Sequence, residues 1–245
     1  MQQLKALLEA PPESVIDELD PADTMFAGNS AHYRRVGLSA LKCLRLALLA
    51  AGKDKVSSLL DCPCGFGRVL RVLQAAFPTT QLAACDLDRQ AVDFCARIFG
   101  AKPYYSNADP GRIELADTFD LIWCGSLLTH LPKDRFVAFI RFFESRLEPG
   151  GVFVFTTHGR RPAEWIRTGL RTYGLHASVF PRLLGAYDHE GFGYADYPGQ
   201  VDNGVSLSSP TWVCAQLRQF DRLRIVLYSE AEWDDHQDVV ACVRL

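Results

Sequence analysis

The stretch that decides the fold spans residues 56 to 68 and reads Val56-Ser57-Ser58-Leu59-Leu60-Asp61-Cys62-Pro63-Cys64-Gly65-Phe66-Gly67-Arg68. A short apolar run ends at Asp61, a turn containing Gly65 and Gly67 follows, and an amphipathic run begins after Arg68. This order predicts a buried strand, a tight glycine turn and a helix. In an open α/β sheet, such a junction places backbone N–H groups at the carboxyl edge of the strands, where ligands bind.

The bulk composition is that of a globular protein with a mildly acidic surface. The chain has 245 residues, of which 48% are hydrophobic and 22% charged, with a formal net charge of -3. This length suits one large domain or a domain with an insertion. The charge gives no support to a nucleic-acid or membrane role, and no signal-peptide or membrane-spanning pattern stands out. We therefore expect a cytoplasmic protein that binds a small molecule, and the composition leaves a monomer and a homodimer both open.

The cysteines predict a reduced protein rather than a disulfide framework. Eight cysteines are present, and most of them lie inside strand-like or helical apolar runs. Buried free thiols explain that placement. Cys62 and Cys64 form a C-x-C pair with no matching second pair, so no metal site is predicted.

Strands and helices alternate along most of the chain. The apolar pattern predicts strands at residues 56–61, 81–86, 102–106, 119–124 and 152–157, with helices between them. Such alternation is typical of a mostly parallel sheet with helices on both faces. Two final strands, 223–229 and 239–245, are too close together for a crossover helix and predict an antiparallel hairpin. Before the first strand, short helical pieces are expected in residues 1–28, and a helix from Asn29 or Ser30 to Ala51, ending at Gly52.

The pattern divides the chain into three parts. Residues 1–55 are expected to form an N-terminal helical cap, and residues 56–245 the main domain. Between residues 159 and 209 the strand–helix alternation lapses into glycines and aromatic residues. Segments of this length in a compact domain are usually lids or binding elements, so we predict a substrate lid inserted after the fifth strand.

The residues of the glycine turn narrow the choice of ligand. A P-loop requires Lys and then Ser or Thr after its last glycine, whereas Arg68 follows Gly67 here. A dinucleotide turn would carry a third glycine where Leu70 stands. Asp61, directly before the turn, would repel a phosphate and suits a ligand with a positive charge or an amino group.

With these features the sequence resembles the class I S-adenosylmethionine-dependent methyltransferases. The similarity to their first motif lies in Leu60-Asp61-x-x-Cys64-Gly65-x-Gly67-Arg68. Pro63 stands where the first glycine is usual and removes one N–H, so the contact with the methionine part of the cofactor is expected to differ. Asp86 matches the acidic residue that accepts from both ribose hydroxyls, and Leu87 would pack on the adenine. The resemblance implies S-adenosylmethionine as cofactor and a seven-stranded Rossmann-like sheet, mostly parallel, with an antiparallel last strand.

The resemblance implies further cofactor contacts in the N-terminal helix and after the third and fourth strands. These are Tyr33, Ala108, Asp109, Cys124, Gly125, Ser126 and His130. It covers residues 59–245 in order, and the motifs are informative because they occur together in register.

Histidines at the expected binding edge of the sheet are the candidates for acting on the methyl acceptor. A hydroxyl acceptor is helped by a base, for which His, Asp and Glu are suited. His158 ends the fifth strand, and His236 lies in the turn of the final hairpin, so both are candidate catalytic residues. The predicted substrate contacts are Asp188, His189, Tyr194, Trp233 and Asp234.

A softer similarity indicates the kind of acceptor. Three stretches resemble small methyltransferases encoded beside glycan-assembly enzymes, namely Met25-Phe26-x-Gly28, Gly204-Val205-Ser206-Leu207-Ser208-Ser209-Pro210-x-Trp212 and Trp233-Asp234-x-His236-Gln237-Asp238-Val239. This similarity implies O-methylation of a sugar or another small polar metabolite. Two alternatives remain: a non-catalytic S-adenosylmethionine-binding regulatory module, and an NAD or nucleotide-sugar oxidoreductase on the same sheet, which Asp61 disfavours.

Overall fold

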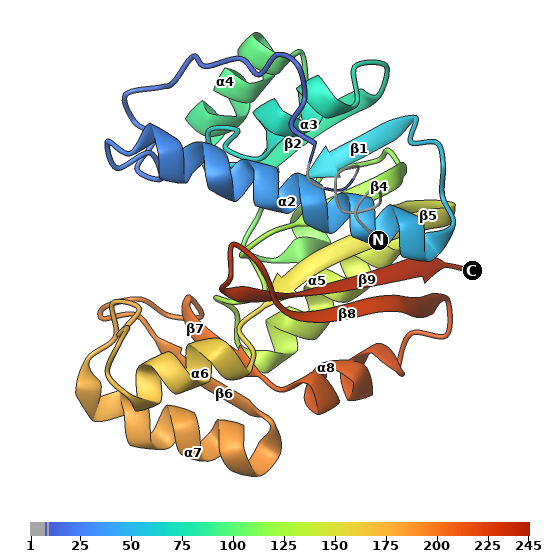
Figure 1. Cartoon of the computed structure of the whole chain (residues 1–245). Coiled ribbons are helices and arrows are strands. Elements are labelled where there is room, and N and C mark those ends of the chain that lie inside the picture. Colours follow the sequence, from blue (N-terminus) through green and yellow to red (C-terminus); the bar gives the residue numbers. More distant parts are fainter. Residues whose placement is uncertain (1–7, 9) are drawn as a thin grey trace.

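A seven-stranded sheet forms the centre of the molecule (Figure 1). The computed structural model describes residue 8 and residues 10–245. The strand order is β3-β2-β1-β4-β5-β9-β8. The strands are β1 (Ser58–Asp61), β2 (Gln81–Asp86), β3 (Lys102–Tyr105), β4 (Phe119–Cys124), β5 (Leu147–Thr157), β8 (Leu223–Trp233) and β9 (Gln237–Arg244).

The strand directions match the sequence prediction. β1 to β5 pair in parallel, whereas β9 is antiparallel to both β5 and β8. β8 consequently runs in the same direction as β5. The mostly parallel Rossmann-like sheet with an antiparallel last strand is therefore confirmed, and the turn between β8 and β9 lies at the edge where the parallel strands end.

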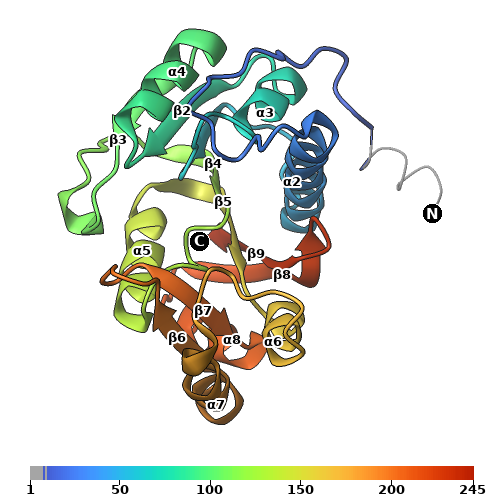
Figure 2. The same ribbon diagram turned by 90° about the vertical axis from the view of Figure 1, so that its left-hand side faces the viewer.

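Helices cover both faces of this sheet (Figure 2). One face packs against α2 (Ser30–Ala51), α3 (Leu70–Ala76) and α4 (Arg89–Phe99), and the other against α5 (Lys133–Ser145) and α8 (Pro210–Leu217). Because side chains alternate along a strand, the adjacent residues Leu59 and Leu60 belong to different hydrophobic clusters. Within the described residues, no helix is both long enough and apolar enough to span a membrane.

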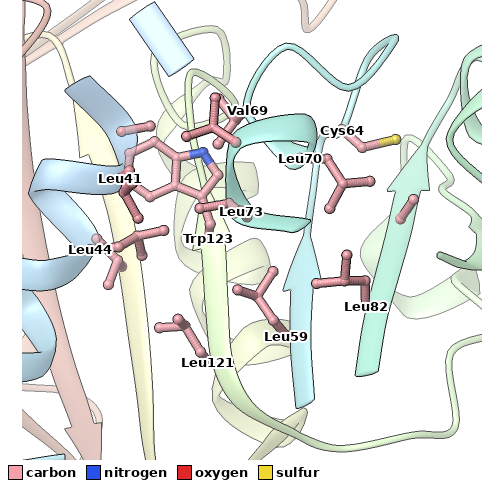
Figure 3. Packing of buried hydrophobic residues seen from close by; sticks show 14 of the residues in the cluster. Leu41, Leu44, Leu59, Cys64, Val69, Leu70, Leu73, Leu82, Leu121 and Trp123 are labelled. Carbon is pink, nitrogen blue, oxygen red and sulfur yellow. The ribbon is translucent and has the colours of Figure 1, made fainter. Parts of the chain in front are cut away.

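Helix α2 has the bounds that its sequence predicts. The Asn29 side chain accepts the His32 N–H at its start, and Gly52 adopts the left-handed conformation at its end. Its Leu41 and Leu44 lie beside Trp123 of β4, which is 1% exposed (Figure 3). This packing fixes α2 against the strands that carry the glycine turn.

The segment before α2 differs from the sequence prediction. Residues 10–28 form turns and irregular backbone, so the prediction of short helices there is wrong, while residues 1–7 and 9 lie outside the described residues. The side chains of Asp20 and Asp23 accept the N–H groups of Ala22 and Met25. Aspartate side chains that bind the backbone two residues on favour turns over helix, which explains the difference.

The insertion after β5 is a folded unit with its own small core. In chain order it contains α6 (Arg160–Arg167), the 3-10 helix η2 (Ala177–Val179), α7 (Phe180–Glu190), β6 (Phe192–Asp196) and β7 (Gly204–Ser208). The other 3-10 helix, η1 (Pro110–Arg112), lies between β3 and β4 of the main domain. Most of its buried apolar side chains form a cluster of their own, whereas Phe192 of the insertion belongs to a cluster of the main sheet. The N–H groups of Gly204, Ser206 and Ser208 donate to the carbonyls of His130, Thr129 and His158 at 3.0, 2.9 and 2.8 Å. These bonds attach β7 to the loops that follow β4 and β5.

The cysteines are as the sequence predicts. All eight are free thiols, and Cys214 alone among them is half-buried while the others are buried. Burial raises the pKa of the Cys43 and Cys242 thiols, which keeps them protonated.

Candidate cofactor site and acceptor cleft

The two glycines of the turn serve different purposes. Both have positive φ, +48° at Gly65 and +75° at Gly67. A Cβ on Gly67 would lie 2.3 Å from Cε2 of Phe99, whereas a Cβ on Gly65 would meet nothing within 4 Å. Gly67 therefore permits close packing against α4, and Gly65 leaves open space above the turn.

Asp86 lies opposite the turn, at the end of β2. Its Oδ2 accepts the Gly65 N–H at 2.8 Å, and its Oδ1 accepts the Asp88 N–H at 3.0 Å. A carboxylate has about four acceptor positions, so two remain. The half-buried Asp86 side chain is thus held in place with acceptor capacity for a vicinal diol.

Pro63 and Cys64 form the first half of the turn. The peptide bond between Cys62 and Pro63 is cis. The Cys64 N–H donates to the Cys85 carbonyl at 3.0 Å, which ties the turn to β2. With Cys64 engaged in this way and Pro63 lacking an N–H, neither backbone position has a donor to offer a ligand.

Asp61 is a buried carboxylate without a partner. Its side chain is 1% exposed, and in the described part of the chain neither oxygen has a hydrogen-bond partner. Burial raises the pKa of Asp61, Asp86 acts in the same direction, and Arg68 opposes them. Buried polar groups are normally paired, so this carboxylate calls for a cationic group from a ligand.

The residues predicted to contact an adenine lie at the surface beside Asp86. Leu87 is 62% exposed. Asp109 is exposed and accepts the Gly111 N–H at 2.9 Å, while the carbonyl of Ala108 accepts from Arg135. Their role in binding stays a prediction.

At the end of β4, polar side chains join three strands. The Ser126 N–H donates to Oγ1 of Thr156 at 2.8 Å, Thr156 donates to Oε1 of Gln237 at 2.6 Å, and Nε2 of Gln237 donates to the Ser126 hydroxyl at 3.0 Å. The network links β4, β5 and β9. It positions the predicted Gly125–Ser126 segment, after the buried Cys124, and it adds Gln237, which the sequence analysis did not select.

Tyr33 is buried rather than exposed to a ligand. Its hydroxyl donates to Oδ2 of Asp23 at 2.5 Å, and the Arg71 guanidinium carbon lies 5.1 Å from its ring centroid. Arg71 also donates to the carbonyls of Ile16 and Glu18 at 2.9 and 3.0 Å. Tyr33 and Arg71 together hold the N-terminal segment against the glycine turn.

A cleft of about 1000 Å³ lies between α2, the start of the insertion and the β8–β9 turn. The predicted site residues that line it are Arg68, Ser126, Trp233, Asp234 and His236. The cleft thus brings together residues from the first motif, the fourth motif and the final hairpin.

His236 presents a neutral ring to this cleft. Its Nε2 lies 2.8 Å from the Tyr173 hydroxyl, and its ring lies 5.1 Å from Trp165 and 5.2 Å from His158, centroid to centroid. Burial lowers the pKa of His236 to about 4, and Arg171 acts in the same direction. At neutral pH the imidazole is therefore uncharged and able to accept a proton.

His158 and His130 lie behind His236. His158 is 2% exposed, its Nδ1 has no partner in the described residues, and burial lowers its pKa well below the ordinary value. Nδ1 of His130 lies 2.9 Å from the Gly204 carbonyl oxygen and 3.0 Å from the Tyr197 hydroxyl. His130 therefore joins the loop after β4 to the insertion, and burial lowers its pKa also.

Three predicted substrate residues lie outside the cleft lining. Asp188 and His189 are exposed on α7, where Asp188 pairs with Arg167 at 2.9 Å. The Tyr194 hydroxyl donates to Asp196 at 2.5 Å. In the part of the chain that the structure describes, no group of three or more His, Cys, Asp or Glu side chains is arranged to hold a metal ion.

The sequence analysis also missed part of the cleft. Arg161, Trp165 and Arg171 line it from the insertion, and Arg35 and Lys42 line it from α2. The run Arg160-Arg161-Pro162-Ala163-Glu164-Trp165, which begins two residues after His158, was the available signal because it follows a strand at the binding edge.

Comparison with known proteins identifies the domain. Residues 60–153 match a family model described as a methyltransferase domain. This part of the chain is a methyltransferase domain. The unpaired Asp61, the open space at Gly65 and the remaining acceptor positions of Asp86 fit the amino group, the body and the ribose of S-adenosylmethionine.

Several solved structures share the fold of this chain. DesVI from Streptomyces venezuelae has a TM-score of 0.62 and 17% identity, with 93% of this chain and 100% of that chain covered. An S-adenosylmethionine-dependent methyltransferase from Clostridium acetobutylicum ATCC 824 has a TM-score of 0.58 and 14% identity, with 91% of this chain and 95% of that chain covered. The N-methyltransferase NodS from Bradyrhizobium japonicum WM9, in complex with S-adenosyl-L-homocysteine, has a TM-score of 0.53 and 16% identity, with 99% of this chain and 97% of that chain covered. No curated protein sequence matches the chain.

Proposed function

We propose that this protein transfers a methyl group from S-adenosylmethionine to a hydroxyl oxygen of a small polar molecule such as a sugar. The observation that carries the proposal is the neutral imidazole of His236, which lines a cleft of about 1000 Å³ together with Arg68 and Ser126 of the cofactor motifs. The volume suits a small molecule rather than a polymer.

In this proposal, the cofactor side is held by residues of the first two strands. Asp61 binds the ammonium of the methionine part, Arg68 its carboxylate, and Asp86 the ribose hydroxyls. When bound, S-adenosylmethionine supplies the electrophilic methyl group. The protein contributes the position of the acceptor and the exclusion of water.

His236 acts as the base in the proposed reaction. With Nε2–H donating to the Tyr173 hydroxyl oxygen, which lies 2.8 Å away, Nδ1 carries the free lone pair. Burial raises the pKa of Tyr173, so its phenol stays protonated and uncharged. The acceptor oxygen bonds to the methyl carbon as the carbon–sulfur bond breaks, and the hydroxyl proton passes to Nδ1 of His236. His158, packed behind the ring of His236, is proposed as a positioning residue.

The fold alone does not choose the acceptor atom. Its structural neighbours include the N-methyltransferase NodS and the mitomycin 7-O-methyltransferase MmcR. Oxygen is favoured here by the polar cleft and by His236, because a hydroxyl benefits from a base more than a free amine does. The eight free cysteines support a reducing compartment, the cytoplasm, as the place of action.

Turnover of a metabolite extract tests the proposal. The purified chain is incubated with the extract and S-adenosylmethionine carrying a deuterated methyl group, and products are found by mass spectrometry. We expect a labelled methyl ether of a small polar compound, and less of it with Asp86→Ala. Binding of S-adenosylmethionine without any labelled product would favour the regulatory-module alternative, and a labelled amine would contradict transfer to oxygen.

A further inference from the structure

The charges in the acceptor cleft are unevenly paired. Four acidic side chains line it, and each has a cationic partner. The pairs are Arg160–Glu230, Lys42–Glu232 at 3.0 Å, Arg35–Asp234 at 2.9 Å and Arg161–Asp235 at 2.7 Å. Two guanidinium groups of the lining, Arg68 and Arg171, have no ion pair within residues 10–245. All four acidic side chains of the lining are thus in ion pairs, whereas these two arginines are not.

Arg68 belongs to the cofactor side of the cleft. It directly follows Gly67, and the charges that act on it are those of Tyr33, Asp23, Asp234 and Asp61. Arg171 is different, because it comes from the insertion and its guanidinium carbon lies 4.3 Å from the ring centroid of Trp165. Trp165 in turn contacts His236. Arg171 is therefore the unpaired cation on the acceptor side.

We propose that the methyl acceptor carries a negatively charged group, a carboxylate or a phosphate, which Arg171 binds while the reacting hydroxyl faces His236. This inference rests on the proposed function and deepens it by naming the substrate class. A guanidinium that lies over an indole ring can still direct its N–H groups at the paired oxygens of such an anion.

The surroundings of His236 give this anion a second effect. The groups that face His236 are Tyr173 and His158, and the charges acting on it are Arg171, Arg161 and Asp234. The two arginines lower its pKa, so an anion bound to Arg171 would offset part of that lowering. His236 would then be a stronger base when an acceptor of the right charge is present.

Calorimetry on the chain saturated with S-adenosylhomocysteine tests the anion subsite. The probes are glucuronate and glucose 6-phosphate, with neutral methyl glucoside for comparison. We expect at least one anionic probe to bind about tenfold more tightly than methyl glucoside. The tighter of the two anions shows whether carboxylate or phosphate is preferred.

Three variants assign the effect to Arg171. Arg171→Gln should abolish the preference for the anion, Arg171→Lys should restore part of it, and Arg182→Gln, on the exposed surface of α7, should match the wild type. Equal binding of charged and neutral probes, no anionic binding below about 10 mM, or an unchanged preference in Arg171→Gln would overturn the proposal.

The subsite and the proposed function fail in different ways. Methyl transfer to neutral hydroxyl compounds that is unaffected by Arg171→Gln would refute the subsite and keep the function. Anion binding through Arg171 without any transfer to oxygen would refute the function and keep the subsite.

Discussion

The proposed cofactor site and the proposed acceptor cleft are built in opposite ways. The cofactor site comes from one short strand, its turn and Asp86 on the neighbouring strand, and it contains a buried carboxylate, Asp61, without a partner. The cleft is assembled from α2, the insertion and the β8–β9 turn, and its acids are paired with arginines and a lysine. Binding at the cofactor site therefore depends on backbone geometry and one unpaired carboxylate. Binding in the cleft depends on individual side chains, which can be substituted without changing the backbone.

The largest effect is expected from Gly67→Ala, which tests the dependence on backbone geometry. The substitution should lower the free energy of unfolding by about 3 kcal/mol, because φ is +75° and the new Cβ would lie 2.3 Å from the Phe99 ring. Urea denaturation measures it. Gly65→Ala is the matched control: with no clash it should cost about 1 kcal/mol of stability while blocking the cofactor. Equal losses of stability in both variants would contradict the distinction between the two glycines.

Next in size is the loss of the base on the acceptor side. His236→Ala should lower kcat about 100-fold, the range of general-base catalysis, and leave the Kd for S-adenosylmethionine within about twofold. Steady-state kinetics on the methylated acceptor and calorimetry measure the two quantities. His176→Ala, in the insertion but outside the cleft lining, is the control. A matching rise in the Kd of His236→Ala would show that the two sites are not separable.

A smaller effect is expected at the ribose position. Asp86→Ala should weaken S-adenosylmethionine binding by about 1–3 kcal/mol, the range for a hydrogen bond to a charged group. Asp88→Ala provides the comparison, since its side chain caps α4 and its loss should cost about 1 kcal/mol of stability without changing the affinity. Unchanged calorimetric affinity in folded Asp86→Ala would refute the ribose assignment.

The smallest effect is expected from Asp61→Asn, which should raise the stability of the unliganded chain but lower its affinity for S-adenosylmethionine. Burial raises the pKa of Asp61 above its ordinary value, so the folded state disfavours the ionised carboxylate and loses stability as the pH rises. At pH 7.5, Asp61→Asn should therefore raise the free energy of unfolding of the unliganded chain by about 1 kcal/mol. The same variant should weaken S-adenosylmethionine binding. Thermal unfolding with and without S-adenosylhomocysteine checks both, and a less stable unliganded variant would contradict the unpaired charge.

The sequence was sufficient to predict the helices and the turn around the proposed cofactor site because their signals are local. Asn29 and Gly52 delimit α2, and Asp88 and Gly100 delimit α4, through caps that involve only neighbouring residues. The glycine turn is likewise contiguous, so its spacing alone indicates the strand, the turn and the helix.

The acceptor cleft was only partly predictable, for the opposite reason. Trp233, Asp234 and His236 could be placed because hairpin topology fixes which edge their turn reaches. Arg171 and Trp165 could not, since their approach to His236 depends on how the insertion packs. The insertion itself contains β6 and β7, whose partners are each other and the loops after β4 and β5, contacts that no local pattern encodes. Helix α7 had a usable signal in Pro181 near its start and Gly191 after its end.

Arg71 has a consequence for how freely the N-terminal segment can change. It fastens that segment through the carbonyl oxygens of Ile16 and Glu18, and every amino acid supplies such an oxygen. The side chains of Ile16 and Glu18 can therefore change, by mutation or over evolution, while these two hydrogen bonds persist. Arg71 itself has no such freedom, because its guanidinium group donates both of these hydrogen bonds.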